Sequence, residues 1–462
     1  MGWQPLHEEC GVFGIFGADK AAANVLAGLS ALQHRGQEGC GVATVEETGR
    51  MAVRKGLGLV SRVFPRESFR DHGGRHAIGH VRYGTSGGGE LDNVQPFLFR
   101  RDSGEFAIVH NGNIVNTEEL KMELERMGTL FRSSSDSEIL GHLIHTLSPR
   151  KEGMTISSIK RALNLIDGAF SFLILTPDRM FACRDKYGFR PLSIGQLGNG
   201  YAVASETCAL HAVGARVLRD VQPGELVEIG PEGITSTFFA RERRNTMCAM
   251  EYIYFARPDS DIEGINVHSY RVESGKILFR ESPVEADMVF GVPDSGLSGA
   301  IGFSRASGLP LEMGLIKNFY TGRTFIQPNQ SLRMTGVRMK LTPVPSVVRG
   351  KRVVVIDDSI VRGTTSRQIV RMLRDAGAAE IHLRITSAPL RHPCFYGVDI
   401  STESELISSR MSVDEVCRFI GADSLAFLSE AGMLEAGRRT ELCMACFNDR
   451  YPTALYSHSK ER

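Results

Sequence analysis

Residues 352–366 read RVVVIDDSIVRGTTS, and this stretch decides the fold of the second half of the chain. Its run 353–356 is short, apolar and β-branched, which is typical of a strand buried in a parallel sheet. Two carboxylates, Asp357 and Asp358, end that run. A turn rich in small and hydroxyl residues follows, and the pattern then predicts a helix over 368–376.

A strand, a hydroxyl-rich turn and a helix N-terminus together form an anion site. Backbone N–H groups, hydroxyls and the helix dipole all favour a phosphate there. The two carboxylates cannot hold a phosphate, but they accept hydrogen bonds from sugar hydroxyls and bind hard cations such as Mg²⁺. The stretch therefore predicts a site for a phosphorylated sugar. The alternative interpretation is a strand end with a solvated Asp pair.

This stretch resembles the 5-phosphoribosyl-1-pyrophosphate (PRPP) loop of the type I phosphoribosyltransferases. The resemblance implies that PRPP is bound by the loop residues Asp357, Asp358, Ser359, Arg362, Gly363, Thr364, Thr365 and Ser366. It also implies contacts from three basic residues outside the loop, Lys317, Arg323 and Lys340. For Lys340, an exposed surface position is the alternative.

A second turn, at 293–296, lies between a predicted strand over 287–292 and a predicted helix over 297–306. The family binds pyrophosphate at such a turn, and Ser295 resembles a hydroxyl ligand to Mg²⁺ beside Asp357 and Asp358. An ordinary turn serine is the alternative. Residues 317–326 resemble the family's mobile loop, but Phe319 stands where an arginine is expected, and Thr321 where an aliphatic residue is expected. This departure puts in doubt one pyrophosphate contact, or the tightness of coupling.

Composition sets the broad class. A chain of 462 residues predicts about two or three domains. An apolar content of 42% and a charged content of 23% are those of a soluble globular protein. A net charge of +1 gives no support for binding to nucleic acid or to an anionic membrane. No apolar run reaches the roughly 18 residues of a membrane span, and the start MGWQPLHEE lacks the features of a secretory signal, so we expect a cytoplasmic enzyme.

Cys10 opens the strand-like string CGVFGIFG, and a lone cysteine is usually a small buried hydrophobe. Several further strings change that interpretation: QHRGQE at 33–38, GHVRYGT at 79–85 and VHNGNI at 109–114. In the last of these, Asn-Gly-Asn predicts a turn that breaks the strand. The string SSSDSE at 133–138 then predicts an N-cap cluster before a helix over 139–147.

In this order, the strings resemble the class II, or N-terminal nucleophile, glutamine amidotransferase domain over residues 10–227. The resemblance implies autoprocessing, with cleavage after Glu9 and residues 1–9 as a propeptide. The freed α-amino group of Cys10, with a pKa near ~8, would then activate the thiol. It further implies that Asn111 and Gly112 form the oxyanion hole. The implied glutamine-binding residues are Arg35, Gly36, Arg82 and Asp136. The alternatives are a hairpin turn for Asn111 and Gly112, and a helix cap for Asp136.

The chain has nine cysteines, an odd number and widely spread, which does not indicate a disulfide framework. Cys443 and Cys446 have metal-ligand spacing, but one such pair is weak evidence because a site needs two more ligands. The chain also resembles the glutamine phosphoribosylpyrophosphate amidotransferases. In one branch of that family, cysteines at the positions of Cys248, Cys394, Cys443 and Cys446 bind a [4Fe–4S] cluster. Four thiolates suit zinc equally well, so the cluster is implied by the resemblance alone.

Taken together, the resemblance extends over nearly the whole chain to the glutamine phosphoribosylpyrophosphate amidotransferase family. It implies an α+β N-terminal-nucleophile (αββα) sandwich over 10–240, then an α/β phosphoribosyltransferase domain with a mainly parallel sheet over 241–462. The implied reaction moves ammonia from glutamine to PRPP and yields 5-phosphoribosylamine, glutamate and pyrophosphate, the first committed step of purine biosynthesis. The resemblance further implies Mg²⁺ as a cofactor, allosteric inhibition by purine nucleotides, and a homotetrameric assembly.

Two other functions are considered. One is the same glutaminase feeding a sugar-phosphate isomerising aminotransferase, which the 357–366 loop argues against. The other is a nucleotide-sensing regulator without catalysis, which the intact glutamine-site residues Cys10, Arg82, Asn111 and Asp136 argue against.

Overall fold

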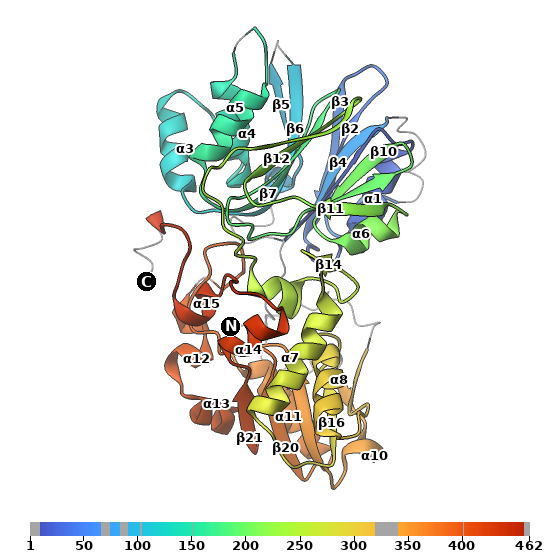
Figure 1. Cartoon of the computed structure of the whole chain (residues 1–462), viewed down its shortest axis with the longest axis vertical. Coiled ribbons are helices and arrows are strands. Elements are labelled where there is room, and N and C mark those ends of the chain that lie inside the picture. Colours follow the sequence, from blue (N-terminus) through green and yellow to red (C-terminus); the bar gives the residue numbers. More distant parts are fainter. Residues whose placement is uncertain are drawn as a thin grey trace.

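The computed structural model describes residues 10–65, 74–83, 91–101, 104–149, 151–318, 341–400 and 402–456. Two bodies lie one above the other along the long axis of the molecule (Figure 1). The first half of the chain, coloured blue to green, builds the upper body, and the second half, yellow to red, builds the lower body. In these residues no helix is both long and apolar enough to cross a membrane.

Two antiparallel sheets face each other in the upper body. The first has the strand order β11-β9-β10-β1-β4-β2-β3, and the second has the order β13-β12-β8-β7-β6-β5. The first sheet consists of β1 (Gly11–Phe16), β2 (Gly39–Val45), β3 (Met51–Leu57), β4 (His76–Arg82), β9 (Ser193–Leu197), β10 (Gly200–Ala204) and β11 (Arg216–Asp220). The second consists of β5 (Phe97–Arg101), β6 (Gly104–Ile114), β7 (Gly168–Leu175), β8 (Met180–Arg184), β12 (Glu225–Gly230) and β13 (Gly233–Phe238).

Alternation along the strands explains how this sandwich is filled. In β1, Val12 points into the core between the sheets, where it joins Val109 and Leu173 of the opposite sheet. The next residue, Phe13, points outward and packs under the helices of the first sheet, as the two-residue period of a strand requires. Helices therefore cover both outer faces, which confirms the expected αββα sandwich. The first sheet carries α1 (Ala21–Ala31), α2 (Val60–Val63) and α6 (Thr207–Ala212), and the second carries α3 (Thr117–Arg126), α4 (Ser137–Leu147) and α5 (Ile156–Leu165).

The predicted turn at Asn-Gly-Asn is wrong. Strand β6 runs without a break through Asn111, Gly112 and Asn113, and it pairs with β7 along its whole C-terminal half. Gly112 adopts a φ of 143°, and a Cβ atom there would lie 2.0 Å from the carbonyl oxygen of Ala169. Only glycine fits a strand at this distance and backbone angle, so Gly112 keeps the ladder intact instead of ending it.

A four-stranded parallel sheet of order β16-β19-β20-β21 forms the centre of the lower body. One of its two central strands, β19 (Arg352–Asp357), is the start of the stretch RVVVIDDSIVRGTTS. Val354 and Ile356 pack toward α7 and α8, whereas Val353 and Val355 pack toward α11 and α13. Burial on both faces explains the continuous β-branched run and confirms the mainly parallel α/β fold.

The elements of the lower body have the following bounds. The strands of the sheet are β16 (Met288–Gly291), β19, β20 (Glu380–Ile385) and β21 (Ser424–Phe427), and two small hairpins are β14 (Asp261–Ile262) with β15 (Ile265–Asn266) and β17 (Leu315–Lys317) with β18 (Leu341–Pro343). The helices are η3 (Glu251–Phe255), a π-helix, then α7 (Val267–Glu281), α8 (Gly296–Ser307), α10 (Pro345–Val348), α11 (Thr364–Asp375), α12 (Ile407–Arg410), α13 (Val413–Ile420), α14 (Glu430–Ala436) and α15 (Ala445–Asn448).

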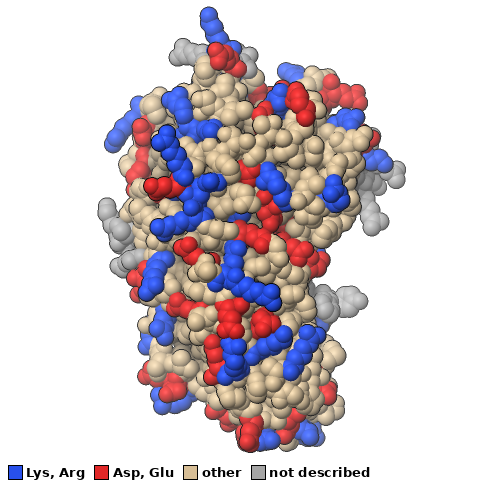
Figure 2. Space-filling model, viewed as in Figure 1, with Lys and Arg blue, Asp and Glu red and all other residues tan. Residues whose placement is uncertain are grey.

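The two bodies are joined by a buried cluster at their junction. Val115 and Phe189 of the upper body pack there against Tyr396 and Cys443 of the second half. The ring of Phe189 stacks on that of Tyr396 at 4.3 Å between centroids. The predicted domain boundary at 240/241 falls shortly after β13, the last strand of the sandwich. On the face shown in Figure 2, basic and acidic residues are interspersed over both bodies, as the net charge of +1 leads one to expect.

Candidate active sites

Cys10 lies directly before β1 and is half-buried. Its Sγ atom donates to the main-chain oxygen of Tyr83 at 3.7 Å, just beyond the end of β4. Arg82 is the last residue of β4, and it is also largely buried. The pairing of β1 with β4 therefore brings two of the predicted glutamine-site residues to the same end of the first sheet.

Asn111 lies on β6 in the opposite sheet and is fully buried. Within the described part of the chain, neither its side-chain nitrogen nor its side-chain oxygen has a hydrogen-bond partner. Such a group costs stability, because folding removes its water without replacing the bonds. Strand β4 of the first sheet packs on β6 here, since His80 Nε2 lies 3.0 Å from the main-chain oxygen of His110. A buried amide without a protein partner is compatible with the predicted donor to a substrate oxygen.

Asp136 stands at the N-terminus of α4, but its side chain makes no capping bond to that helix. Its Oδ2 atom instead accepts the N–H of Ile114 on β6 at 2.9 Å. Burial raises the pKa of Asp136, but the nearby His110 and these hydrogen bonds outweigh it, so the pKa lies below its ordinary value. The alternative of a simple helix cap therefore lacks its defining contact, and the ionised carboxylate suits an ammonium group.

Arg35 and Gly36 follow α1 and differ in what they offer a substrate. A Cβ atom at Gly36 would lie 2.6 Å from the main-chain carbon of Arg82, so only glycine permits this close approach. The Arg35 side chain is buried in ion pairs with Glu206 and Glu251, and its Nε–H donates to the carbonyl oxygen of Cys10 at 3.1 Å. The structure thus places the guanidinium against protein groups; its predicted role in binding glutamine stays a prediction.

In the lower body, Asp357 ends β19 and Asp358 follows it, both largely buried. Burial and the mutual repulsion of the two carboxylates raise the pKa of Asp357. Burial likewise raises the pKa of Asp358, although hydrogen bonds from Ser295 and Ser359 oppose that shift. A cation or a set of sugar hydroxyls would relieve this repulsion, which is the chemistry predicted for the pair.

The phosphate loop differs from the prediction in where its helix begins. Helix α11 starts at Thr364, four residues earlier than expected, because Gly363 at a φ of 71° supplies the left-handed N-cap. Thr364, Thr365 and Ser366 therefore form the first helical turn, where free N–H groups favour an anion. Arg362 of the loop is paired with Glu405 at 2.7 Å.

The turn before α8 packs against the same strand end. The N–H of Val292 donates to Ile356 at 2.8 Å, and Ser295 reaches Asp358 by a side-chain hydrogen bond. Asp294 of this turn forms an ion pair with Lys317. The fold thus brings together Ser295, the Asp pair and Lys317 from three segments. Arg323, Lys340 and the two departures Phe319 and Thr321 lie outside the described residues.

The four predicted cluster cysteines come from three segments and meet near the junction. Cys248 forms a β-bridge with Cys443, and the carbonyl of Cys446 accepts the N–H of His392 at 3.0 Å, two residues before Cys394. Burial raises the pKa of the Cys446 thiol well above its ordinary value, and Cys394, Cys248 and Cys443 raise it further. Burial also raises the pKa of Cys443 to about 12. In the described ranges, however, no three His, Cys, Asp or Glu side chains are placed to hold a single metal ion.

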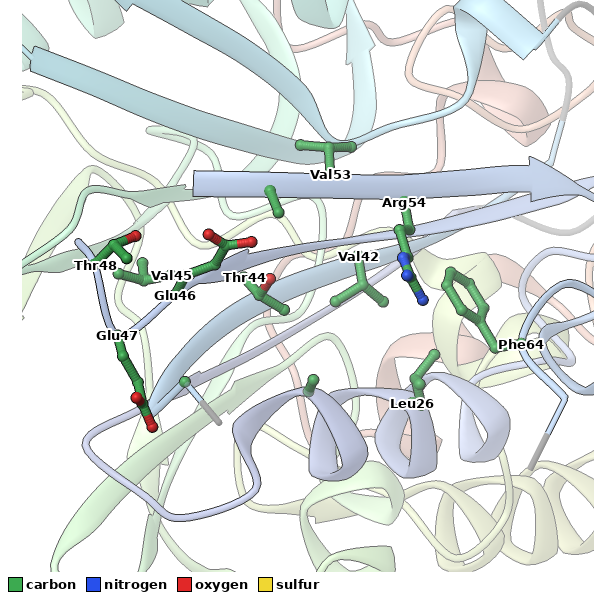
Figure 3. Close-up of a pocket in the computed structure, with 13 residues that line it drawn as sticks. Leu26, Val42, Thr44, Val45, Glu46, Glu47, Thr48, Val53, Arg54 and Phe64 are labelled. Carbon is green, nitrogen blue, oxygen red and sulfur yellow. The ribbon is translucent and has the colours of Figure 1, made fainter. Parts of the chain in front are cut away.

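A cavity of about 620 Å³ lies elsewhere, between α1 and the β2–β3 hairpin (Figure 3). Leu26 of α1 faces Val42 and Arg54 across it. Its lining also includes Phe64 and Gly74, which flank a part of the chain that the structure does not describe. None of the predicted site residues lines it, and mixed apolar and charged walls alone indicate no ligand.

Sequence reasoning missed two sets of residues that contact the predicted site residues Asp136 and Arg35. The first is His110, which neighbours Asn111 in the chain and lies 3.8 Å from Asp136. The second is the pair of carboxylates, Glu206 and Glu251, that hold Arg35. Only adjacency to a predicted residue could have drawn attention to His110, and no sequence signal links the two carboxylates to Arg35.

Comparisons with known proteins agree with this arrangement. Residues 89–212 match a family described as a glutamine amidotransferase domain, and residues 276–393 match one described as a phosphoribosyl transferase domain. An amidophosphoribosyltransferase of Bacillus subtilis is 53% identical over 98% of this chain and 95% of that protein. The chain belongs to the amidophosphoribosyltransferase family.

Further relatives extend the similarity. The amidophosphoribosyltransferase of Archaeoglobus fulgidus is 47% identical over 96% of this chain and 98% of that protein. The solved structure of the B. subtilis glutamine PRPP amidotransferase, complexed with ADP and GMP, has a TM-score of 0.91 at 52% identity and covers 97% of this chain and 98% of that one. The chain is therefore a glutamine-dependent glycosyltransferase that forms 5-phosphoribosylamine from PRPP in purine biosynthesis. Neither the isomerising aminotransferase nor the non-catalytic regulator remains as an alternative.

Proposed function

We propose that the two predicted sites divide the reaction between the bodies, with Cys10 as the nucleophile that attacks the glutamine amide. The observation that carries this proposal is the buried Asn111 side chain, which has no hydrogen-bond partner among the described residues. It follows His110, whose carbonyl oxygen contacts His80 of β4. We infer that its amide and the Gly112 N–H stabilise the oxyanion as the thioester forms.

The glutamine itself would be held by charge at both ends. Arg82 would bind the α-carboxylate through its planar, two-pronged donor. Asp136, ionised because its pKa is depressed, would bind the α-ammonium. Water then hydrolyses the thioester to glutamate, after ammonia has left for the lower body. Cleavage of the Glu9–Cys10 bond would free the α-amino group that activates the thiol; residues 1–9 lie outside the described part.

In the lower body, the carboxylates of Asp357 and Asp358 would bind the ribose hydroxyls, and the first turn of α11 the 5′-phosphate. Five further residues are retained as predicted PRPP contacts: Ser359, Arg362, Lys317, Arg323 and Lys340. Mg²⁺, held by Ser295 and the Asp pair with substrate oxygens, would neutralise the pyrophosphate as it leaves. Three oxygen donors suit a hard cation that keeps several waters.

We also propose that Cys248, Cys394, Cys443 and Cys446 hold a [4Fe–4S] cluster rather than zinc. Cys248, Cys394 and Cys443 all raise the pKa of the Cys446 thiol, which supports one shared site for the four. Four thiolates suit zinc and an Fe–S cluster equally well, so the choice of a cluster comes from the family resemblance. Its part would be structural, tying the C-terminal segment to the junction.

Iron and sulfide analysis of anaerobically purified protein decides this point. We expect about four irons and four sulfides per chain; one zinc per chain with no sulfide would overturn the proposal.

Several further properties are proposed from the family. A domain boundary at 240/241, a homotetramer and a cytoplasmic location remain predictions. Allosteric inhibition by purine nucleotides is supported by the B. subtilis structure, which holds ADP and GMP.

The experiment that tests the two-site proposal is glutamate release from glutamine, measured anaerobically with Mg²⁺, with and without PRPP. We expect a large PRPP-dependent increase, with pyrophosphate formed in step. A rate of glutamate release that does not depend on PRPP would mean that the two sites are not coupled as proposed. Phe319, which stands where the family resemblance leads us to expect an arginine, would then be the first residue to change, as Phe319→Arg.

A further inference from the structure

The guanidinium of Arg35 is completely buried, and within the described part of the chain it contacts Cys10, Glu206 and Glu251. Its Nε–H donates to the carbonyl oxygen of Cys10 at 3.1 Å. Its Nη atoms bond to Glu206 at 2.7 Å and to Glu251 at 3.0 and 2.8 Å. Because the guanidinium is planar and rigid, the carboxylates that orient it also determine where it holds the main chain of Cys10.

The two carboxylates have different origins. Glu206 belongs to the upper body, where it is the N-cap of α6 and also accepts from His34 and Ser260. Burial raises the pKa of Glu206, but His34 and Arg35 outweigh it and hold the pKa well below its usual range. Glu206 is therefore an ionised partner that the sandwich itself supplies.

Glu251 is instead the first residue of η3, beyond the last strand of the sandwich, and it is completely buried. Its Oε1 atom also lies 3.3 Å from Arg190 Nη1, so the carboxylate lies between two arginines of the upper body. Figure 1 shows that η3 lies at the level where the two bodies meet. Glu251 thus reaches across the junction to the residue that holds Cys10.

The lower body fixes the position of η3. Arg271 of α7 donates from Nε to the carbonyl of Tyr252 and from Nη2 to the carbonyl of Ala256, each at 2.8 Å. A π-helix is a rare element that needs such support for its carbonyl groups. The carboxylate of Glu251 is consequently presented by an element that is anchored in the lower body.

We propose that Glu251 is a positioning residue for the Cys10 nucleophile and that it acts through Arg35, so that the glutaminase geometry depends on the docking of the lower body. The inference rests on the proposed role of Cys10. The α-amino group and the thiol belong to the residue whose carbonyl Arg35 holds, so a shift of that carbonyl moves both. A misplacement of about 1 Å can cost about a hundredfold in rate.

The primary test is Glu251→Gln in the full-length, processed enzyme, with the N-terminus verified by intact mass. We expect the kcat of glutamine hydrolysis to fall about tenfold to a hundredfold, with KM for glutamine within twofold of wild type. Synthesis from free ammonium should stay within twofold, because that reaction does not use Cys10. The rate at which a diazoketone analogue of glutamine alkylates Cys10 should fall in parallel with kcat.

Glu263→Gln is the matched control. Glu263 is also a carboxylate at the junction, with its side chain 10% exposed, and it is paired with Arg184 of the upper body at 2.7 Å and with Arg439. Among the described residues its ion-pair partners are Arg184 and Arg439 rather than Arg35, so its loss weakens the junction without changing the contact that holds Cys10. Its glutaminase kcat should stay within about threefold of wild type.

A second variant covers the case in which Glu251→Gln does not fold. Arg35→Lys keeps the positive charge between the carboxylates but loses the Nε–H that reaches Cys10, so kcat should fall while KM is kept. In that background, Glu251→Gln should cost little more, because both act on one contact.

Three results would overturn the inference: a wild-type kcat in Glu251→Gln or Arg35→Lys, an equal loss in Glu263→Gln, or an equal loss of ammonium-dependent synthesis. Failure of the proposed role of Cys10 itself would show separately, as an active Cys10→Ala variant.

Discussion

The Nδ1 atom of His110 lies 3.8 Å from Oδ1 of Asp136, and the same nitrogen lies 2.8 Å from the hydroxyl of Ser137. The imidazole ring stacks on Phe172 at 4.2 Å between centroids, so it cannot turn away. The pKa of Asp136 is depressed although burial alone would raise it, and His110 is the largest opposing influence. If Asp136 binds the glutamine ammonium as proposed, that recognition depends on His110, which keeps the carboxylate ionised.

His110→Phe should weaken glutamine binding in a pH-dependent way. Phenylalanine keeps the stack on Phe172 but removes the influence that lowers the Asp136 pKa, which then rises through burial. A carboxylate with a depressed pKa stays ionised as the pH falls, so losing the depression matters most at low pH. We expect KM for glutamine to rise about threefold at pH 8 and about tenfold at pH 6.

His145→Phe, on α4 and away from Asp136, serves as the control and should keep the wild-type pH profile. An equal increase in KM at both pH values would contradict the electrostatic role of His110.

Asn111→Leu should separate activity from stability. The buried amide has no partner among the described residues, so a leucine of similar shape removes an unsatisfied group and should leave the free energy of unfolding equal or about 1 kcal/mol higher. Loss of an oxyanion donor should lower the glutaminase kcat by about 10² to 10³. Urea unfolding and steady-state kinetics measure the two effects on the same preparation.

Asn113→Leu, on the same strand, is the control, and its effects on stability and kcat should be the reverse of those of Asn111→Leu. Its side-chain nitrogen donates to the carbonyl of Phe395 at 3.0 Å, so the variant should lose stability and keep most of its kcat. If Asn111→Leu is the variant that loses stability, its amide is a structural group rather than a substrate donor.

Glu138→Gln should destabilise the enzyme near neutral pH but not in acid. Burial raises the pKa of Glu138, but hydrogen bonds from His142, Ser133 and the Arg132 N–H lower it from 4.5 to about 2. A depressed carboxyl pKa stabilises the fold above the unfolded value and loses this contribution as the pH falls through the folded value. The shift corresponds to roughly 3 kcal/mol at pH 7.

The difference in unfolding free energy between Glu138→Gln and wild type should therefore shrink steadily between pH 5 and pH 3. Glu123→Gln, exposed on α3, should show no such dependence. A constant difference at all pH values would mean that lost packing, not lost charge, causes the effect.

Cys10→Ala should abolish synthesis from glutamine and spare synthesis from ammonium at high concentration. Ammonium reaches the lower body without a thioester, so only the glutamine reaction needs the thiol. Loss of both activities would contradict the assignment of separate sites.

Asp357→Asn should impair synthesis with either nitrogen source, by at least about a hundredfold. The carboxylate is proposed to bind PRPP and Mg²⁺, which both reactions share. Glutamate release without PRPP should be unchanged, and a selective loss of the glutamine reaction would place Asp357 in coupling rather than in PRPP binding.

Local patterns predicted several elements of the fold, whereas the two architectures were implied by the family resemblance. The run 353–356 predicts a strand that is buried on both faces. In β19, Val354 and Ile356 pack toward α7 and α8, and Val353 and Val355 pack toward α11 and α13. Two local expectations failed for backbone reasons. Asn-Gly-Asn resembles a hairpin turn, but pairing with β7 keeps β6 extended, and Gly363 starts α11 four residues before the apolar pattern does.

What the sequence alone determined was the order of the two domains and the residue types that carry their chemistry, because strand alternation, glycine positions and hydroxyl-rich turns are encoded over a few neighbouring residues. The tertiary structure alone decided which of these residues meet. The pairing of Arg35 with Glu251, the gathering of four cysteines from three segments, and the approach of His110 to Asp136 join residues far apart in the chain. Such contacts depend on sheet register and on how the bodies dock, and no local propensity specifies either.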